Sequence, residues 1–367
     1  MKIVVTGSRG FIGKNLCTSL RENNYDVLEI HRDTLKSDAL SHLSEAGFVF
    51  HLAGVNRPES NTEFKKGNVE FTQFIVDGLK ESNNGASLVL ASSTQASDNN
   101  DYGKSKLVAE KIIESYYKNT SNYGYILRLP NVFGKWCKPD YNSFVATFCN
   151  NILNDRDIVI NDHSAKVSLA YIDDVCASFI NLIEEKPESG LHYLKNQYNS
   201  TVGEVAKILK DFRGVRDSLV SERVGVGLNR ALYATFLSYA HPKDFSYPIR
   251  SYSDNRGVFC EMLKTRDSGQ FSYFTALRGI TRGGHYHHTK NEKFLVIKGQ
   301  AEFKFENIST GERHRLTVNG DSPEIVETVP GWSHDITNIG DEELIVMLWA
   351  NEVFDRDRPD TFAKDLF

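Results

Sequence analysis

A glycine-rich turn close to the start of the chain restricts the possible folds more than any other feature. Residues 2–5 form a short β-branched run, and the segment Thr6-Gly7-Ser8-Arg9-Gly10-Phe11-Ile12-Gly13 follows it directly. Glycines three residues apart let a backbone turn sharply, approach a pyrophosphate closely and pack the next helix against a sheet. Any tight turn from strand to helix also needs glycine, but the position directly after a first strand favours a dinucleotide-binding turn.

Apolar runs of strand type continue along the first part of the chain. They lie at residues 25–30, 48–54 and 87–94, and stretches of helical character separate them. Strands that alternate with helices form a parallel, doubly wound sheet, which binds ligands at the carboxyl ends of its strands. The first part is therefore predicted to be an α/β Rossmann-type doubly wound parallel sheet.

The residue types in these turns bear on which dinucleotide is bound. An NAD enzyme usually has an acid at the end of the second strand, where it binds the ribose. This chain has His31 and Arg32 there. Arg32 and Arg9 suit the extra phosphate of NADP, although two exposed arginines without a ligand give the same pattern. We predict NADPH as the cofactor.

A tyrosine and a lysine at residues 102 and 106 form the first candidate for catalysis. They begin a run with helical apolar spacing, so they lie on one helix face. A phenol is a poor proton donor at neutral pH, but a neighbouring cation lowers its pKa and makes it a usable general acid. Thr94, at the end of the preceding strand, has a hydroxyl that can bind the substrate oxygen that Tyr102 protonates. The same residues also occur on solvated helix faces and in capped turns.

Five landmarks in this order resemble the extended short-chain dehydrogenase/reductase family, and specifically its nucleotide-sugar members. They are the glycine turn, His51-Leu52-Ala53-Gly54, Ser92-Ser93-Thr94, Tyr102 with Lys106, and Arg128-Leu129-Pro130-Asn131-Val132-Phe133-Gly134. The resemblance implies that Thr94, Tyr102 and Lys106 are catalytic and that hydride passes between a nicotinamide and a sugar carbon. The residues expected to contact the cofactor are Gly7, Arg9, Gly10, Phe11, Ile12, Gly13, Arg32, Leu52, Ala53, Gly54, Tyr102 and Lys106.

Two further features of this resemblance concern the substrate. Residues 142–145 and 166–175 are similar to segments that wrap the nucleotide diphosphate, which implies contacts from Asn142, Ser143 and Lys166. Polar surface residues are common in such segments without a ligand. Only seven residues separate Thr94 from Tyr102, a shorter loop than these enzymes usually carry, so we expect a more open site.

The character of the sequence changes near residues 241–244. Helical periodicity stops, and short alternating runs separated by glycine and asparagine turns follow. This spacing predicts an all-β antiparallel barrel or jelly roll. We therefore divide the chain into residues 1–243 and 244–367, with the boundary placed to within about ten residues.

The most specific signal lies within this second part. His285 and His287 are two residues apart on a strand, Glu292 returns from the next strand, and His334 follows the turn Pro330-Gly331-Trp332-Ser333. Three imidazoles and one carboxylate suit Zn, Fe, Mn, Ni or Cu. A single histidine is more often structural, but the combination favours one divalent metal ion, with Zn preferred.

This pattern is similar to both motifs of the cupin family. The resemblance implies a cupin jelly-roll barrel in which His285, His287, Glu292 and His334 bind the metal, with Tyr286 and His288 nearby for acid–base work. Residues 254–261 and 282–285 also look like segments of the cupin-type nucleotide-sugar 3,5-epimerases. Those enzymes move a proton on the carbon next to a 4-keto group, a step that a metal beside the ketone assists.

The chain as a whole resembles the bifunctional capsular-polysaccharide enzymes in which a nucleotide-sugar reductase is fused to a metal cupin. The resemblance implies that the cupin epimerises C3 of a UDP-2-acetamido-2,6-dideoxy-hexos-4-ulose. The reductase then reduces C4 with NADPH to a UDP-N-acetyl-6-deoxy-L-talosamine, a precursor of UDP-N-acetyl-L-fucosamine. Two alternatives are a monofunctional reductase with a structural, dimerising metal cupin and a dinucleotide-sensing protein with a decayed site. The intact Thr94, Tyr102 and Lys106 oppose the second.

Composition adds limits on partners and location. The chain of 367 residues is long enough for two cores, and a net charge of −5 gives no basic surface for nucleic acid. The five cysteines are scattered without a C-x-x-C pair, which suits a reducing compartment. No segment approaches the roughly 18 apolar residues of a membrane span. We predict a cytoplasmic enzyme and, because cupin barrels often pair through an edge strand, a homodimer.

Overall fold

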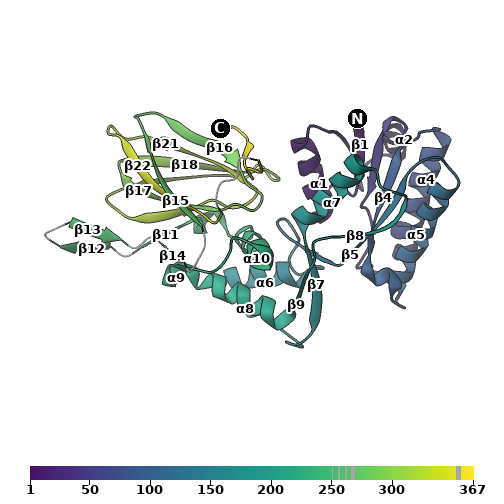
Figure 1. Ribbon diagram of the computed structural model, residues 1–367, viewed down its shortest axis with the longest axis horizontal. Helices are drawn as coiled ribbons and strands as arrows, with labels where there is room; N and C mark the ends of the chain where they lie inside the picture. The colour runs from purple at the N-terminus through teal and green to yellow at the C-terminus, as the bar shows by residue number, and fades with distance from the viewer. Residues whose placement is uncertain (250, 255–256, 261–262, 266–268, 353–356) are drawn as a thin grey trace. The chain divides into compact units, whose positions relative to one another are not determined.

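The computed structural model describes the chain except residues 250, 255–256, 261–262, 266–268 and 353–356. Its contacts divide it into two compact units (Figure 1). The first unit contains Met1–Phe133, Tyr141–Ser143 and Val167–Asn199, and the second contains Gly134–Asp140, Phe144–Lys166 and Ser200–Phe367. Several segments before residue 244 therefore belong, by their contacts, to the unit that holds the C-terminal strands.

A six-stranded parallel sheet forms the centre of the first unit and confirms the predicted Rossmann-type fold. Its strand order is β2-β1-β3-β4-β5-β8, and all neighbours are parallel. The strands are β1 (Lys2–Thr6), β2 (Asp26–Ile30), β3 (Phe48–His51), β4 (Ser87–Ser93), β5 (Gly124–Leu129) and β8 (Gly190–Tyr193). Folds of this class bind ligands beside the point where the strand order reverses, which here lies between β1 and β3.

Helices and two short helical turns accompany the strands of this sheet. They are α1 (Phe11–Glu22), α2 (Lys36–Glu45), α3 (Thr62–Phe64), α4 (Phe71–Glu81), α5 (Asp101–Lys118) and α7 (Ile172–Glu185), with a π-helical turn η1 (Lys65–Glu70) and a 3-10 turn η2 (Thr94–Ser97). In α4, Ile75, Val76 and Leu79 are fully buried in one core with Val49 and Leu88 of the sheet. Helix α1 packs with α7, whereas α4 packs with α2 and α5 (Figure 1). No helix in the described part of the chain has both the length and the apolar composition needed to span a membrane.

Smaller elements connect this sheet to the rest of the chain. Strands β6 (Asn131–Phe133), β7 (Lys166–Tyr171) and β9 (Tyr198–Thr201) form a three-stranded sheet. The second unit contains helices α6 (Phe144–Leu153), α8 (Val202–Arg213), α9 (Val215–Ser218) and α10 (Gly227–Leu237) and the 3-10 turn η3 (Pro242–Asp244). It also contains the pairs β10 (Val220–Ser221) with β14 (Lys264–Thr265) and β12 (Ser251–Asp254) with β13 (Gly257–Cys260).

Two five-stranded antiparallel sheets enclose the core of the second unit and confirm the predicted all-β cupin barrel. The first is β11 (Ser246–Pro248), β20 (Glu324–Glu327), β17 (Glu292–Lys298), β22 (Leu344–Ala350) and β15 (Gln270–Ala276). The second is β19 (Arg313–Asn319), β18 (Gln300–Asn307), β21 (Trp332–Asn338), β16 (Thr281–Tyr286) and β23 (Phe362–Ala363). Alternate residues of β18, namely Ala301, Phe303 and Phe305, are buried in one core with Phe294 and Val346 of the other sheet, as the period of a strand requires.

A buried ion pair joins the outer face of this barrel to α9. Lys293 and Glu327 are 1% and 2% exposed and form an ion pair. The other carboxylate oxygen of Glu327 accepts a hydrogen bond from Nη2 of Arg216 at 2.9 Å. The ammonium of Lys293 also donates to the Tyr247 hydroxyl at 3.2 Å. One carboxylate therefore pairs with two basic groups, of which Lys293 is fully buried and Arg216 is 20% exposed.

This arrangement predicts a large stability loss for Glu327→Ala. Removal of one partner leaves two cations without their carboxylate, and the free energy of unfolding of the second unit should fall by about 3–5 kcal/mol. The matched control is Glu342→Ala, which breaks the exposed pair between Lys298 and Glu342 and should change the stability by about 0.5 kcal/mol or less. Urea denaturation followed by tryptophan fluorescence measures both, and equal losses in the two variants would contradict the prediction.

Candidate active site and candidate metal centre

The glycine turn of the first unit depends on two close backbone approaches. Gly7 has φ of +67°, and a Cβ there would lie 2.8 Å from the backbone nitrogen of Ala53. A Cβ on Gly13 would lie 2.2 Å from the carbonyl oxygen of Gly7. Helix α1 begins at Phe11, and its N-cap residue, Gly10, has no side chain to cap the first amides. The turn thus leaves the amides of Phe11 and Ile12 at the position where such folds bind a pyrophosphate.

The two arginines predicted to bind NADP lie on this same side of the sheet but differ in their partners. Nη1 of Arg9 is 2.8 Å from Oδ2 of Asp33, and both side chains are mostly exposed. Arg32 is an exposed residue of the turn after β2. An acid, Asp33, is therefore present one residue beyond the position that the sequence analysis inspected, so the turn contains both a carboxylate and guanidinium groups.

A buried histidine holds the second turn of the cofactor region, at Leu52, Ala53 and Gly54. The hydroxyl of Thr72 donates to the carbonyl of Asn68 at 2.6 Å, so it accepts from Nε2 of His51 at 2.8 Å. Nδ1 of His51 then accepts from the Thr6 hydroxyl at 2.8 Å, and Thr6 Oγ1 accepts from the amide of Ala53 at 3.1 Å. Burial and the charge of Lys106 lower the pKa of His51 to about 3, so this imidazole stays neutral.

Asn68 connects the second turn to the helix that carries Tyr102. Its side chain accepts from the amide of Val55 at 2.7 Å and donates to Ser105 Oγ at 2.9 Å. Ser105 in turn donates to the carbonyl of Tyr102 at 2.7 Å. Asn68 lies in the π-helical turn η1, a type of turn that is frequent at functional sites. Sequence analysis missed it because one asparagine in a polar segment forms no pattern.

Tyr102 and Lys106 lie one turn apart at the start of α5, as their spacing predicts. Asn100 caps this helix by accepting from the amide of Gly103 at 2.7 Å. Lys106 is only 6% exposed, and its ammonium donates to the carbonyl of Ala91 at 2.9 Å. Burial lowers the pKa of Lys106 to about 8, against the opposing effect of Glu110.

The pKa of Tyr102 differs from the expectation. Burial raises this pKa above its usual value, and a hydrogen bond with the Ser93 hydroxyl acts in the opposite direction. Lys106 is not among the groups that shift this pKa, and its ammonium binds the carbonyl of Ala91. In this state of the protein Tyr102 is therefore a protonated phenol at neutral pH, which is the form that a proton donor needs.

Ser93 is a second candidate for the hydroxyl beside Tyr102, because its side chain hydrogen-bonds with Tyr102, and the role of Thr94 stays a prediction. Ser93 is the last residue of β4, and its Oγ also accepts from the amide of Gln95 at 3.2 Å. Thr94 begins η2 and is exposed. Side chains alternate along a strand, so Ser92 and Ser93 point to opposite faces.

The three candidate substrate contacts are polar surface positions. Asn142 is exposed and Ser143 is half-buried, both just before α6 in the first unit. Lys166 is exposed at the start of β7 and is grouped with the second unit. These positions are accessible to a ligand, and their predicted role stays a prediction.

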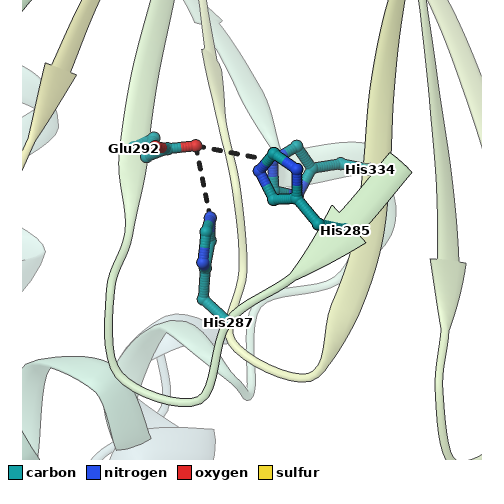
Figure 2. Close-up of side chains that lie close together, drawn as sticks. All are labelled: His285, His287, Glu292 and His334. Atoms are coloured by element: carbon teal, nitrogen blue, oxygen red, sulfur yellow. Dashed lines mark hydrogen bonds and ion pairs between the residues drawn. The ribbon is translucent and has the colours of Figure 1, made fainter. Parts of the chain in front are cut away.

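The second unit brings all four predicted metal ligands together. One ligand atom from each of His285, His287, Glu292 and His334 lies within 4.8 Å of the others (Figure 2). Nε2 of His287 and Nε2 of His334 are each 3.4 Å from Oε2 of Glu292. His287, Glu292 and His334 are buried. The side chains converge from β16 with its following loop, β17 and β21.

A β-bulge in β16 produces this convergence. Gly283 pairs with Asp335 and His285 pairs with His334, so the register shifts at Gly284. Gly283 and Gly284 have φ of +105° and +74°, a region that only glycine adopts readily. A Cβ on Gly283 would lie 2.9 Å from the carbonyl oxygen of His334. The glycines before His285 therefore set its side chain opposite His334.

The electrostatics of the cluster suit a divalent cation. Burial alone would raise the pKa of Glu292, but the neighbouring His287 and His334 hold it well below its usual range. Burial and the neighbouring imidazoles lower the pKa of His285 to about 3, and burial also lowers the pKa of His334. Three imidazoles and one carboxylate form a donor set that fits a zinc-like or other transition metal ion.

Asp360 orients His287 and the loop after it. Its carbonyl oxygen is 2.5 Å from Nδ1 of His287, which leaves Nε2 for the cluster. Its carboxylate accepts from the amides of His288, Thr289 and Lys290 at 2.9, 2.7 and 2.7 Å. Sequence analysis missed Asp360 because no local pattern connects it to a histidine 73 residues away.

Three other residues that were predicted to be functional in this part contact neighbouring residues of the second unit. Tyr286 and His288 both pack against the ring of Phe362, with centroids at 5.5 and 5.0 Å. Arg282 donates to the carbonyl of Thr275 at 3.1 Å. Of the epimerase-like segment 254–261, residues 255, 256 and 261 lie outside the described residues.

Comparison with known proteins defines the class of the chain. Residues 3–199 match the NAD dependent epimerase/dehydratase family, and residues 252–362 match the polysaccharide biosynthesis C-terminal domain. The chain belongs to the NAD dependent epimerase/dehydratase family, and a nicotinamide cofactor follows from this membership.

Two known proteins are similar to this chain over its full length, and a third shares the fold of part of it. The chain is 51% identical over 365 residues to UDP-2-acetamido-2,6-beta-L-arabino-hexul-4-ose reductase of Pseudomonas aeruginosa, with 99% of this chain and 98% of that protein covered. It also matches the crystal structure of the capsular polysaccharide assembling protein CapF from Staphylococcus aureus, with 40% identity, a TM-score of 0.69 and 100% of both chains covered. A UDP-N-acetylglucosamine 4-epimerase from Bacillus cereus shares the fold over 58% of this chain and 82% of its own, with 24% identity and a TM-score of 0.53.

The cluster predicts that Glu292→Ala removes bound metal. The variant loses the charged ligand of the set, so its apparent affinity for Zn²⁺ should fall at least about 100-fold. Metal content after dialysis against a competing chelator measures this change. Glu312→Ala, an exposed carboxylate on the same barrel, is the matched control and should bind as wild type. Equal zinc retention by both variants would contradict the assignment.

Proposed function

We propose that the chain is a bifunctional nucleotide-sugar enzyme of capsular polysaccharide synthesis. The cupin, residues 244–367, epimerises C3 of UDP-2-acetamido-2,6-dideoxy-hexos-4-ulose. The reductase, residues 1–243, then reduces the C4 ketone to a UDP-N-acetyl-6-deoxy-L-talosamine on the route to UDP-N-acetyl-L-fucosamine. The observation that supports this most strongly is the presence, in one chain, of a half-buried tyrosine with a buried lysine one helical turn away and of a His₃Glu cluster. The full-length similarity to a UDP-sugar 4-keto reductase supports the same substrate class.

The reductase chemistry follows from the groups around Tyr102. Reduction of a ketone places a hydride on carbon and a proton on oxygen. NADPH bound at the glycine turn supplies the hydride. Tyr102 donates its proton to the C4 oxygen while the Ser93 hydroxyl, which hydrogen-bonds with Tyr102, holds that oxygen in place. The phenolate that remains needs a positive charge nearby, and Lys106, one helical turn away, supplies it once its ammonium turns from the carbonyl of Ala91 toward Tyr102.

The order of the two reactions follows from the chemistry of the substrate. The proton on C3 is acidic only while C4 is a ketone, so epimerisation must precede reduction. A divalent metal bound by His285, His287, Glu292 and His334, with Zn the first choice, supplies positive charge beside the ketone oxygen and favours loss of that proton. Glu292 is the one anionic ligand of the cluster, so a divalent ion there keeps a net positive charge.

The choice of NADPH over NADH and the residues that contact the UDP-sugar are also proposals. NADPH is preferred because Arg9 and Arg32 flank the end of β2, although Asp33 lies beside them. Comparison of kcat/KM for NADPH and NADH tests this preference, and a higher value for NADH would refute it. Asn142, Ser143 and Lys166 are proposed to contact the UDP-sugar.

We further propose a cytoplasmic homodimer. Strand β15 forms an edge of its sheet and carries Phe271 and Tyr273, which are 48% and 73% exposed. An exposed edge with apolar side chains is a usual site of strand pairing between copies. Free buried thiols at Cys17, Cys137, Cys149 and Cys176 fit a reducing compartment. A single monomer mass in sedimentation experiments would contradict the dimer.

Substitution of the two hydroxyls tests the reductase mechanism. Ser93→Ala removes the group bonded to Tyr102 and should lower kcat about 100-fold, at the lower end of what general acid–base assistance contributes. Thr94→Ala is the matched control and should stay within about three-fold of wild type, a difference of roughly 0.6 kcal/mol. NADPH oxidation at 340 nm with the UDP-4-keto sugar measures both. A larger loss in Thr94→Ala than in Ser93→Ala would restore Thr94 as the catalytic hydroxyl.

Product identity separates the bifunctional enzyme from the monofunctional alternative with a structural cupin. His285→Ala should give a product with unchanged configuration at C3, or stop reduction, because the barrel no longer assists proton loss. His314→Ala, a barrel histidine outside the cluster, is the control and should give the wild-type product. NMR of the purified products reports the configuration. Formation of the wild-type product at the wild-type rate by His285→Ala would establish the alternative.

A further inference from the structure

A buried ion pair beside Ser93 has no part in the mechanism above. It joins Glu110 of α5 to Arg128 of β5. Nε and Nη2 of Arg128 donate to the two carboxylate oxygens of Glu110 at 2.9 and 2.7 Å. The Glu110 side chain is 4% exposed and that of Arg128 is 17% exposed. Such a bidentate pair fixes both side chains in one geometry.

The pair also binds both ends of the segment that carries Ser93. The Ser92 hydroxyl donates to Oε1 of Glu110 at 2.5 Å. Nη1 of Arg128 donates to Oγ of Ser97 at 3.0 Å. Ser92 directly precedes Ser93, and Ser97 is the last residue of η2. The ion pair therefore clamps residues 92–97 at both ends, with Ser93 inside the clamped segment.

The clamped segment lies directly against the start of α5. A Cβ on Gly103 would be 2.1 Å from the carbonyl oxygen of Gln95. Gly103 follows Tyr102, so a shift of η2 also shifts the distance between Ser93 and Tyr102. A displacement of about 1 Å at a reacting pair is enough to cost roughly 100-fold in rate.

Glu110 also contributes to the charge on Lys106, one helical turn before it. In the described residues, the titratable groups that interact with Lys106 are Glu110 from α5 and His51 from β3, and Arg128 from β5 acts through its ion pair with Glu110. Tyr102 lies one helical turn before Lys106. Burial lowers the pKa of Lys106 to about 8, and the carboxylate of Glu110 opposes this. Burial keeps His51 neutral, with a pKa of about 3. Glu110 is thus the group that helps Lys106 to keep its proton near neutral pH.

We propose that Glu110 and Arg128 are positioning residues of the reductase site, which hold Ser93 against Tyr102 and support the charged form of Lys106. This proposal rests on the proposed function of that site. The two residues have separable roles. The planar guanidinium of Arg128, with its two hydrogen bonds to Glu110, sets the position of Ser93 relative to Tyr102. The charge of Glu110 acts on Lys106.

The first test is Glu110→Gln, which keeps the shape of the side chain and removes its charge. We expect kcat to fall at least about ten-fold while KM for NADPH changes little, because the glycine turn is untouched. The alkaline limb of the kcat–pH profile should move down by about one pH unit, because Lys106 loses its proton earlier without the carboxylate. The matched control is Glu114→Gln, one turn further on the same helix, which breaks only the exposed pair with Lys118 and should leave both quantities unchanged.

Two further variants separate these roles, and the second leaves the buried charges in place. Arg128→Lys keeps the positive charge but loses the guanidinium that binds both oxygens of Glu110, so kcat should fall while the alkaline limb of the pH profile stays in place. Ser97→Ala is an exposed change that removes one end of the clamp, and it should lower kcat about five-fold, the equivalent of one hydrogen bond.

Specific results would overturn the proposal. They are a folded Glu110→Gln variant with wild-type kcat and an unmoved alkaline limb, or, if that variant does not fold, a Ser97→Ala variant with wild-type kcat. Absence of NADPH oxidation by the wild-type enzyme would instead refute the proposed function, so the two failures are distinguishable.

Discussion

The burial of a charged lysine at the edge of a parallel sheet is the constraint on which the first unit depends. Lys106 is 6% exposed, and its ammonium binds the carbonyl of Ala91 at 2.9 Å. A Cβ on Gly54 would lie 3.2 Å from this ammonium, so a side chain there would press on Lys106. A buried charge is costly unless its neighbours are arranged to receive it. His51 is held neutral beside it and Glu110 lies one turn along the helix, so the surroundings of the catalytic pair are set by this charge.

The barrel must also hold polar groups together in a buried site. Four ligating side chains must converge on one point from strands of both sheets, and the bulge at Gly284 brings His285 opposite His334. Asp360 then fixes the imidazole of His287 through its carbonyl oxygen. Three imidazoles around one buried carboxylate form a site that a divalent cation completes. In both units the chemistry depends on polar groups whose partners come from distant parts of the chain.

Sequence analysis recovers what local patterns encode. The glycine turn, the spacing of Tyr102 and Lys106 and the histidine motif each lie within a short segment, and the structure bears out the predicted folds and brings together the four metal ligands. The roles of Asp360, Asn68 and the ion pair of Glu110 and Arg128 could not be predicted from the sequence, because these residues act through contacts that only the fold creates. The choice between Thr94 and Ser93 depends on where a strand ends and a 3-10 turn begins, a boundary that differs by a single residue. The pKa of Tyr102 depends on the direction of the Lys106 side chain, which spacing alone does not determine.

Deuterium exchange at C3 tests the central claim, that the barrel is a catalytic epimerase that prepares the substrate of the reductase. The wild-type protein is incubated in deuterated water with the UDP-4-keto-6-deoxy-N-acetylhexosamine, and proton NMR follows the C3 position without NADPH and after its addition. The account predicts that the C3 proton signal disappears before NADPH is added, and that this exchange is absent in Glu292→Ala. NADPH oxidation by the wild-type enzyme without any exchange at C3 would contradict the account and leave a reductase that carries a structural metal barrel.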